Sequence, residues 1–293
     1  MKCSWNSMAA VSLGCYHSSM RFAVTVQNFG EFVDVHRLVE LAKEAEDFGW
    51  DGFFLWDHIF WGGPPMLDPW VALAAIASTT ERIRIGAMVT PLARRRPWKL
   101  ARETVTLDHL SRGRLIVGVG LGYPPEDEFA RLGEDPDDRV RAQKLDEGLD
   151  VLTGLWSGEP FSYRGKHYQL NDVTFLPRPV QEHLPLWVAG TWPTKRPFRR
   201  AARYDGVVPL MTAPSGEPKL LSPDDLAAVV DYVRRQRDSD TAFDVSLGAA
   251  IPSDPAQARD VVDAFASAGA TWLMEWQPNP DALSARLRAG VPN

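Results

Sequence analysis

Two hydrophobic patterns alternate along the chain from Arg21 onward. Short apolar runs rich in β-branched residues predict buried strands, and the longer segments between them, with a helical period, predict covering helices. The predicted strands are Arg21–Val26, Gly52–Trp56, Ile83–Val89, Leu115–Val119, Leu186–Ala189, Gly206–Leu210, Val245–Ala249 and Thr271–Trp276. This alternation is typical of a parallel sheet built from βαβ units.

Several helix boundaries can also be predicted from the pattern. In Val35–Phe48 apolar residues recur on one face, and Gly49 follows as a helix-ending residue. Elsewhere a capping side chain stands before a proline at the first helical position. Such pairs occur at Asp68-Pro69, Ser222-Pro223, Asp254-Pro255 and Asn279-Pro280.

The number and order of these elements predict an α/β fold of the (β/α)₈ TIM-barrel type. An open doubly wound sheet is the alternative, but Gln27–Gly30 lacks the glycine-rich turn with which such a sheet usually begins. One insertion interrupts the pattern. Phe161–Leu170 alternates around Arg164-Gly165-Lys166, which predicts a hairpin before the fifth strand and a lid or wall of the site.

The first residues lack this regular pattern. We expect residues 1–19 to form a disordered extension, with Met20 as a candidate second start site, and residues 20–293 to form a single domain. The extension has no convincing cleavage site, which argues against a signal peptide. It contains both cysteines, Cys3 and Cys15, so neither a disulfide framework nor a cysteine metal site is expected.

Composition narrows the classes of partner. The chain has 293 residues, of which 45% are hydrophobic and 24% charged, and its net charge is −6. These values are typical of a soluble globular protein and argue against a nucleic-acid partner. No apolar run is long enough to span a membrane. We therefore expect a cytoplasmic protein with a small-molecule substrate.

In a barrel of this type, chemistry is located where the strands end. The second predicted strand ends in the stretch FFLWDHIFW, which places Asp57 and His58 side by side after a buried run. At a strand end their polarity need not be buried. The alternative is that His58 is a core or loop histidine with satisfied hydrogen bonds and that Asp57 caps a turn.

Two other strand ends could hold a ligand. Gly118–Tyr123 reads GVGLGY, a weak dinucleotide signal because the downstream fingerprint is absent; its glycines suit close approach of a flat ring or a neighbouring backbone. Ala189–Thr194 offers hydroxyls and backbone amides before a helix, which suits a phosphate. A plain strand-to-helix turn is the alternative there.

Charge and aromatic residues gather at the same strand ends. Basic groups follow the third and fifth strands and predict a local positive field for an anionic ligand. They are Arg94–Arg96 and Lys195, Arg196, Arg199, Arg200 and Arg203. The aromatic residues Trp56, Trp61, Trp192, Trp276 and Tyr123 suit a large planar ligand, although core packing claims some tryptophans. The histidines show no metal-ligand spacing, and no Gly-x-Ser-x-Gly elbow supports a hydrolase.

Longer motifs carry a family resemblance. They are Leu41–Glu46 with Phe48–Gly52, Leu107–Gly120, Glu147–Trp156, Leu176–Gln181 and Ala201–Gly206. With these motifs the chain resembles the luciferase-like flavin-dependent oxidoreductases, a barrel family that includes bacterial luciferase, alkanesulfonate monooxygenases and enzymes of the deazaflavin F420. The resemblance implies a flavin-type cofactor and an oxidoreductase activity.

The resemblance also implies roles for single residues. Asp57 and His58 match an acid–histidine pair beside the deazaflavin ring, with the histidine catalytic. The segment 86–88, including Ala87 and Met88, matches a third-strand bulge with a non-proline cis peptide. The remaining matches are a cofactor-contacting hydroxyl at Thr90 and a phosphate turn at Gly190, Thr191 and Thr194. From the residues alone, we also expect Gly120 and Gly122 to contact the cofactor. Leu121, Pro125 and Glu126 depart from the family pattern and put cofactor contacts in that loop in doubt.

We therefore expect hydride transfer to or from a small organic substrate, with F420 favoured and with His58, oriented by Asp57, stabilising or protonating the substrate. An FMN-dependent monooxygenase fed by a separate reductase is the main alternative. A non-catalytic flavin-binding barrel and a barrel enzyme without a redox cofactor, such as a lyase, are further alternatives. The apolar helix around Trp70–Ala77 raises the hypothesis of a homodimer.

Overall fold

The computed structural model describes residues 20–292. The predicted extension at residues 1–19, with both cysteines, lies outside the described residues. Within the described part, no helix is long and apolar enough to cross a membrane.

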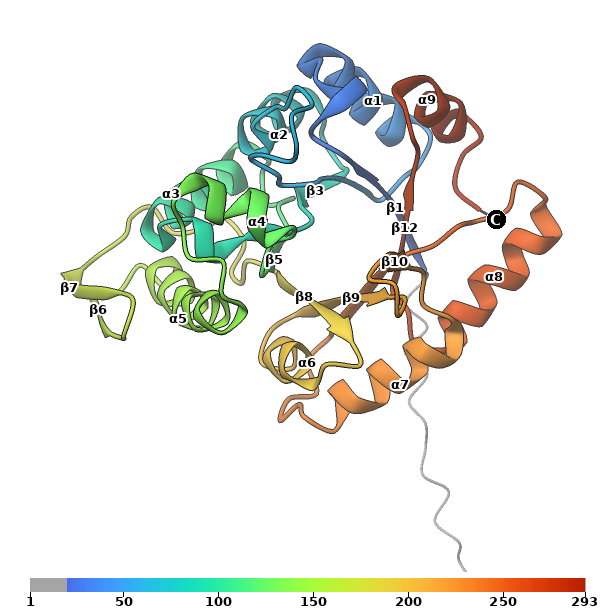
Figure 1. Ribbon diagram of the computed structural model, residues 1–293. Coiled ribbons are helices and arrows are strands. Elements are labelled where there is room, and N and C mark those ends of the chain that lie inside the picture. The colour runs from blue at the N-terminus through green and yellow to red at the C-terminus, as the bar shows by residue number, and fades with distance from the viewer. Residues whose placement is uncertain (1–19, 293) are drawn as a thin grey trace, which may run out of the picture.

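Parallel strands form a barrel, seen along its axis in Figure 1. The sheet runs in the order β3 (Arg84–Ala87), β2 (Gly52–Leu55), β1 (Arg21–Val26), β12 (Trp272–Trp276), β11 (Asp244–Gly248), β9 (Gly206–Thr212), β8 (Leu186–Trp192), β5 (Val117–Gly120) and β4 (Thr90–Pro91). β3 and β4 are two parts of the third barrel strand, with a cis Met88-Val89 peptide between them. A bridge between Ile85 and Leu115 brings the two ends of the sheet together. The barrel prediction is confirmed, and the open doubly wound alternative is excluded.

Helices surround the barrel (Figure 1). They are α1 (Val35–Asp47), α2 (Pro69–Thr79), α3 (Pro97–Leu110), α5 (Asp138–Trp156), α6 (Lys195–Ala201), α7 (Pro223–Arg234), α8 (Pro255–Ser267) and α9 (Pro280–Arg288). Each predicted cap before a proline is confirmed, because the side chains of Asp68, Ser222, Asp254 and Asn279 accept a backbone N–H at the helix start. The starts of these four helices could therefore be predicted from the sequence.

Aromatic side chains fill the centre of the barrel. Phe54, Trp187 and Trp272 come from three different strands, and their ring centroids lie 5.4 to 6.0 Å apart. All three are fully buried. Because the interior is packed, a ligand must bind at an end of the barrel.

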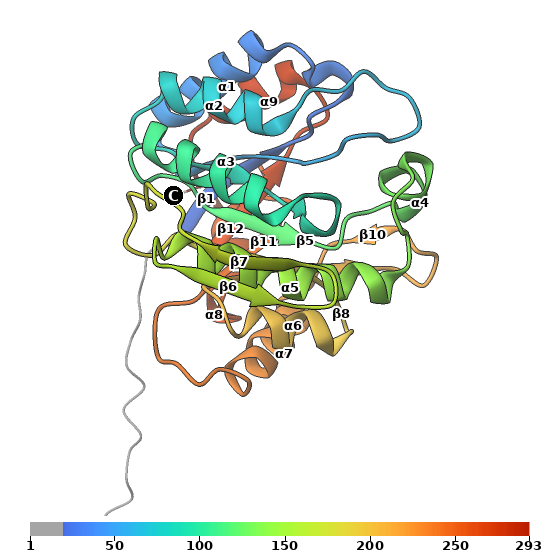
Figure 2. The same cartoon turned by 90° about the vertical axis from the view of Figure 1, so that its left-hand side faces the viewer.

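Short elements gather at the end where the strands terminate. They are α4 (Pro125–Glu128), the 3₁₀ turns η1 (Gly30–Phe32), η2 (Leu92–Arg94) and η3 (Ala130–Leu132), and β10 (Pro218–Lys219), which pairs antiparallel with β9. Figure 2 shows α4 and β10 at the same end of the barrel. We call this end, defined by the segments that follow β2, β4, β5, β8, β9 and β12, the mouth.

A hairpin of β6 (Phe161–Arg164) and β7 (Gln169–Val173) precedes β8. Glu147 of α5 accepts the backbone N–H groups of Lys166, His167 and Tyr168 at 2.8 to 3.0 Å. The Tyr168 ring also lies edge-on against Trp98 of α3. The hairpin therefore covers the outer side of the helical layer (Figures 1 and 2), and the expectation of a lid or wall of the site was wrong.

The predicted dimer helix, α2, turns its apolar face inward. Trp70, Leu73 and Ile76 are buried, whereas Val71 is 70% exposed. The homodimer stays a hypothesis, but most of the apolar surface that suggested it is used in packing within this chain.

Candidate functional site

The buried side chain of Asn28 fixes the position of His58. Its amide nitrogen donates to the His58 carbonyl at 2.8 Å and to the Leu67 carbonyl at 2.6 Å. Its amide oxygen accepts the His58 N–H at 3.2 Å. Asn28 therefore holds both ends of the loop from His58 to Leu67. An asparagine just past the first predicted strand was the sequence signal, but it was not recognised.

The imidazole of His58 is bound by Glu128 of α4. The Nδ1 atom lies 2.9 Å from Oε1 of Glu128, and the Ile59 N–H donates to the same oxygen at 3.2 Å. The other carboxylate oxygen forms an ion pair with Arg94 at 3.1 Å. Because a carboxylate oxygen accepts, this contact assigns a proton to Nδ1, and no described residue hydrogen-bonds Nε2.

The carboxylate of Asp57 is bound by residues other than His58. Arg95 donates to both of its oxygens at 2.9 Å, Arg94 donates to Oδ1 at 3.1 Å, and Trp70 donates to Oδ2 at 3.1 Å. The prediction that Asp57 orients His58 was wrong, and Glu128 holds the ring instead.

The same network binds two arginines of the first basic group, Arg94–Arg96, which follows the third barrel strand. The side chains of Arg94 and Arg95 are only 5% and 17% exposed and lie against Asp57 and Glu128. Burial lowers the pKa of Arg94, an effect opposed by the two nearby carboxylates. These arginines compensate internal charge, so the expectation that they bind an anionic ligand was wrong for both.

In the second basic group, which follows the fifth barrel strand at residues 195–203, some side chains are already bound within the chain. Arg200 pairs with Asp146, and Arg203 pairs with Asp150. Lys195 lies over the Trp192 ring, with its Nζ atom 3.4 Å from the ring centroid. Arg196 and Arg199 are exposed and have no ion-pair partner within residues 20–292, so an anion could still bind here.

Aromatic rings surround His58 at the mouth. Its ring centroid lies 4.8 Å from Trp61, 5.7 Å from Phe29 and 6.0 Å from Trp56. Trp276 stacks on Trp56 at 6.5 Å. Three of the predicted mouth tryptophans thus form one group with His58. Trp192 belongs to a different group, against Phe198 and Tyr232.

The third strand supplies a buried hydroxyl without a partner. Ala87 and Met88 are buried, and the cis peptide follows Met88. The Thr90 hydroxyl is buried, and no described residue hydrogen-bonds it. A buried polar atom normally has a partner, so this one is suited to a bound ligand.

The predicted glycines are needed for packing within the chain. A Cβ on Gly120 would lie 2.7 Å from the Val89 side chain, and one on Gly122, at φ +86°, would lie 2.8 Å from Pro91. At Gly190 it would lie 2.4 Å from the Cβ of Pro197. The close neighbours at these three positions are side chains, whereas a backbone atom, the Ala87 carbonyl oxygen, comes close at Gly118. Contact of Gly120, Gly122 and Gly190 with a cofactor stays a prediction.

The fifth-strand turn has the predicted shape. The Thr194 N–H donates to the Thr191 carbonyl at 3.1 Å, and α6 begins at the next residue. The Thr194 hydroxyl makes no capping hydrogen bond. Both threonines could therefore contact a phosphate, which remains a prediction. Within residues 20–292 no group of three or more His, Cys, Asp or Glu side chains is placed to hold a metal ion.

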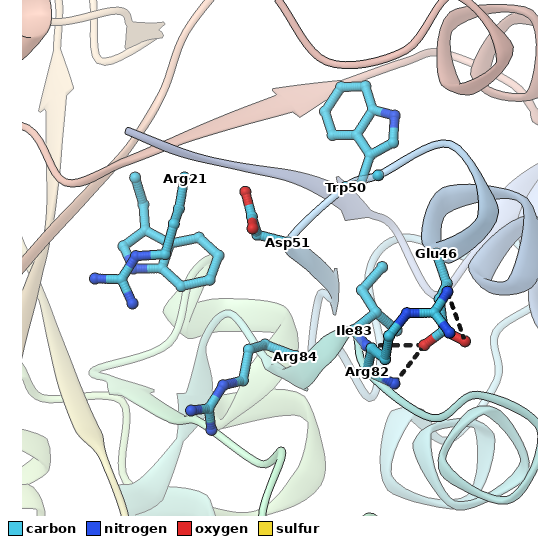
Figure 3. Close-up of a pocket in the computed structure, with 9 residues that line it drawn as sticks. Arg21, Glu46, Trp50, Asp51, Arg82, Ile83 and Arg84 are labelled. Atoms are coloured by element: carbon cyan, nitrogen blue, oxygen red, sulfur yellow. Dashed lines mark hydrogen bonds and ion pairs between the residues drawn. The ribbon is translucent and has the colours of Figure 1, made fainter. Parts of the chain in front are cut away.

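Two cavities lie at opposite ends of the barrel. One of about 250 Å³ borders Asp57 and His58 at the mouth. Another of about 330 Å³ is lined by residues at strand starts, including Arg21, Asp51 and Arg84 (Figure 3). Active sites of this fold lie at strand ends, so the smaller cavity is the functional candidate.

The contacts of the larger cavity explain two of its polar residues structurally. Glu46 accepts the backbone N–H groups of Glu81, Arg82 and Ile83. Figure 3 shows Glu46 beside Arg82 and Ile83. Arg21 pairs with Asp244 and lies over the Trp272 ring. These contacts connect helices and strands at the end of the barrel where the strands begin.

Comparison with known proteins matches residues 9–291 to the luciferase-like monooxygenase family. The chain belongs to this family. The F420-dependent glucose-6-phosphate dehydrogenase of Microbacterium testaceum is 32% identical to this family member over 224 residues, which cover 72% of this chain and 64% of that enzyme. The chain thus spans less than two thirds of the length of that relative.

Solved structures of other proteins have the same fold as this luciferase-like protein. An F420-dependent secondary alcohol dehydrogenase in complex with an F420–acetone adduct matches with a TM-score of 0.76, 17% identity, and 92% of this chain and 98% of that chain covered. The FMN complex of the oxygenating constituent of 3,6-diketocamphane monooxygenase from Pseudomonas putida matches with a TM-score of 0.73, 14% identity, and 92% and 96% covered. Of these two proteins with the same fold, one is F420-dependent and the other is in complex with FMN.

Proposed function

We propose that this luciferase-like protein is an F420-dependent oxidoreductase that moves a hydride to or from a small organic substrate. The observation that carries the proposal is the hydrogen bonding of the two ring nitrogens of His58. Glu128 holds Nδ1, and no described residue hydrogen-bonds Nε2, which lies on a ring packed among aromatic side chains at the mouth. A positioned imidazole with one free nitrogen is suited to proton transfer.

In the oxidative direction, the free Nε2 of His58 accepts the proton of a substrate hydroxyl while the adjacent carbon loses its hydride. The backbone clamp from Asn28 and the Glu128 contact keep the ring in place during this transfer. In the reductive direction the protonated ring returns the proton to the carbonyl oxygen. His58 is thus proposed as the catalytic residue, with Glu128 as its positioning residue and Asp57 as a structural partner of the arginines.

The chain offers suitable contacts for such a cofactor. Thr90 provides the unpartnered hydroxyl, and the backbone around Met88 and Gly120 provides a wall at the third and fourth barrel strands. Thr191 and Thr194, with the cations of α6, are proposed for the phosphate and the acidic tail. When bound, F420 supplies a ring carbon that accepts or donates a hydride.

Two observations favour F420 over FMN. The relative at 32% identity is an F420-dependent dehydrogenase. The His58–Glu128 pair also supplies the proton transfer that accompanies hydride transfer at a hydroxyl. An FMN-dependent monooxygenase fed by a separate reductase is the second candidate, because the family also contains monooxygenases.

Binding of F420 and of FMN to the purified protein tests the cofactor. We expect F420 to bind and FMN to bind at least about tenfold more weakly, measured by titration with tryptophan fluorescence. A preference for FMN would replace the proposal by the monooxygenase. Failure to bind either cofactor would contradict both and favour a barrel enzyme without a redox cofactor.

The variant His58→Ala tests the proposed proton transfer. We expect kcat for substrate-dependent F420 reduction to fall by about 10²- to 10⁴-fold, with F420 affinity unchanged. The variant His36→Ala, at an exposed position of α1, is the matched control and should keep wild-type kcat. Loss of folding in His58→Ala would instead support a structural role for this histidine.

A further inference from the structure

The cavity at the end of the barrel where the strands begin is lined by arginines from two strands. Its volume is about 330 Å³. Arg21, at the start of β1, and Arg84, at the start of β3, both line it, and β2 lies between these two strands. Figure 3 shows both guanidinium groups extending to the same side. The fold therefore brings two cations from separate strands to one cavity.

The guanidinium of Arg84 has no carboxylate partner among residues 20–292. Its Nη1 atom donates to the Gly113 carbonyl at 3.0 Å and to Oε1 of Gln181 at 3.1 Å. Its Nε and Nη2 atoms donate to no described residue. These two atoms form the edge of a guanidinium that can hold two oxygens of a phosphate or carboxylate at once. Arg84 thus offers an unused bidentate donor.

Arg21 adds a second positive charge. Its Nη2 atom pairs with Asp244 at 2.6 Å, whereas its Nε and Nη1 atoms bind no described residue. Burial and the nearby charge of Arg21 lower the pKa of Arg84, and the carboxylates of Asp244 and Asp108 oppose this effect only in part. Repulsion between the two guanidinium groups is thus incompletely balanced. An anion bound between them would relieve it.

The acidic residues that line the cavity make other contacts. Glu46 accepts three backbone N–H groups and lies 3.8 Å from Arg82. Asp51 accepts the Phe22 N–H at 2.8 Å and forms no ion pair within the described part of the chain. Its carboxylate does not point toward the guanidinium groups of Arg21 and Arg84 (Figure 3). Asp51 therefore leaves both arginines free, although its charge opposes an anion.

A buried donor next to Arg21 also lacks an acceptor. Trp272 of β12 lines the same cavity, and the Arg21 guanidinium lies 4.6 Å from its ring centroid. The indole nitrogen of Trp272 is buried, and no described residue accepts its N–H. A buried polar atom normally has a partner, and an indole N–H can only donate. Unused donors at this end of the barrel are suited to a ligand that supplies acceptor oxygens.

We infer that this cavity is a second ligand site, which binds a phosphate group, either as inorganic phosphate or as a compact phosphomonoester. Arg84 holds two phosphate oxygens, and Arg21 adds its charge from the other strand. A phosphate carries up to two negative charges, so it gains more from two cations than a carboxylate does. The ligand connects the starts of β1 and β3 and stabilises the folded barrel. The site lies at the end opposite His58 and requires neither the proposed cofactor nor the proposed reaction.

Titration of the purified protein with phosphate at constant ionic strength tests the site, with calorimetry and thermal unfolding as readouts. We expect saturable binding of inorganic phosphate and a rise in Tm of about 2–4 °C at saturation. Sodium chloride at the same ionic strength should give no rise. Absence of saturable binding of both inorganic phosphate and glycerol 3-phosphate would overturn the inference. Binding of either supports it, and the tighter of the two identifies the source of the phosphate group.

The variant Arg84→Gln removes the bidentate donor and its charge. Phosphate affinity should fall by at least about tenfold. The control Arg196→Gln removes an exposed cation of α6 at the mouth, where the proposed cofactor phosphate would bind, and should leave the affinity for inorganic phosphate unchanged. Unchanged affinity in Arg84→Gln, or loss of phosphate binding in Arg196→Gln, would overturn the inference.

The variant Asp51→Asn tests the same site with the opposite sign. Asparagine keeps an acceptor for the Phe22 N–H and removes the charge that opposes an anion. Phosphate affinity should therefore increase by about three- to tenfold. A loss of stability alone cannot produce both this gain and the loss in Arg84→Gln. Unchanged or weaker phosphate binding in folded Asp51→Asn protein would overturn the inference, even if Arg84→Gln did not fold.

Discussion

Glu128 is the residue that gives His58 a defined orientation. Its carboxylate joins three groups that are distant in sequence, namely the His58 ring, the Ile59 N–H and the Arg94 guanidinium. Side chains that hold the second nitrogen of a functional histidine affect activity through the ring's orientation and basicity. Glu128 should therefore influence turnover without contacting the substrate.

The pair Glu128→Ala and Glu128→Gln tests this role. Alanine removes both hydrogen bonds to Oε1, so we expect kcat to fall by about 10- to 100-fold with F420 affinity unchanged. Glutamine keeps an acceptor oxygen, so it should recover part of the loss. Steady-state kinetics and F420 titration on both variants provide the measurement. Equal activity in the alanine and glutamine variants would show that the acceptor oxygen is not what matters.

Asp57 should act on stability instead of chemistry. Replacing it with asparagine leaves Arg94 and Arg95 buried with an unbalanced charge, which costs about 3–5 kcal/mol of unfolding free energy. The control Glu103→Gln removes a partner 3.9 Å from Arg95 that is more exposed, and should cost about 1 kcal/mol or less. Urea denaturation compares the two. A stable Asp57→Asn protein with lost turnover would restore the catalytic role that the sequence suggested.

Only some residues of the candidate site could be predicted from the sequence. Asp57 and His58 could be located because they follow a buried run at a predicted strand end. Their partners could not, since Glu128 lies 70 positions from His58 and Asn28 lies 30 positions before it. Pairings of this kind depend on how loops from different strands meet at the mouth.

Among the elements, the third barrel strand shows that a hydrophobic pattern can predict a strand correctly and still miss a break within it. Ile83–Val89 was predicted as one strand, and the structure divides the third strand into β3 and β4 around the cis Met88-Val89 peptide. A run of apolar residues indicates burial but not a local break. The predicted hairpin shows the same limit, because alternation indicates one covered face without saying which helices cover it.

The start of β3 is anchored to α1 by Glu46. Burial acts to raise the pKa of Glu46, but hydrogen bonds from the Ile83, Arg82 and Glu81 backbone outweigh it, so the pKa is lowered. The folded protein thus holds fewer protons at Glu46 than the unfolded chain near pH 4.5. The resulting stabilisation is present above that pH and is lost as the pH falls through the lowered value.

The variant Glu46→Gln should lower the unfolding free energy at neutral pH by about 1–3 kcal/mol, because the hydrogen bonds lose their charged acceptor. Its stability should also fall less steeply than that of the wild type as the medium becomes acidic. The control Glu40→Gln lies on the same helix with a 63% exposed side chain and should behave like the wild type. Denaturant unfolding at neutral pH and at pH about 4 provides both readouts. An unchanged acid response in Glu46→Gln would contradict the anchor.

At the scale of the whole molecule, the barrel was predictable because its alternation of elements is carried by many independent segments. Buried strands such as Gly52–Leu55 and capped helices such as the one starting at Pro69 each point to the same architecture. Which residues meet at the mouth depends on closure of the whole sheet. The first basic group illustrates this, since only the folded barrel shows that its arginines are enclosed by carboxylates.

The barrel's alkaline stability should depend on two tyrosines beside α5. Burial raises the pKa of Tyr204 to about 12, and burial together with the Asp150 carboxylate raises that of Tyr163 to about 12. Between pH 10 and about 12 the folded protein keeps these protons while the unfolded chain releases them. Unfolding free energy must therefore decrease as the pH rises through this range.

Phenylalanine variants separate this alkaline effect from hydrogen bonding. No described residue bonds the buried Tyr204 hydroxyl, so Tyr204→Phe should lose no stability at neutral pH. The Tyr163 hydroxyl donates to Asp150 at 3.4 Å, so Tyr163→Phe should lose up to about 1 kcal/mol. In both variants, the decrease in unfolding free energy between neutral pH and pH about 11 should be smaller than in the wild type. Urea unfolding at these two pH values measures it, and a decrease as steep as in the wild type would show that the folded protein does not retain these protons.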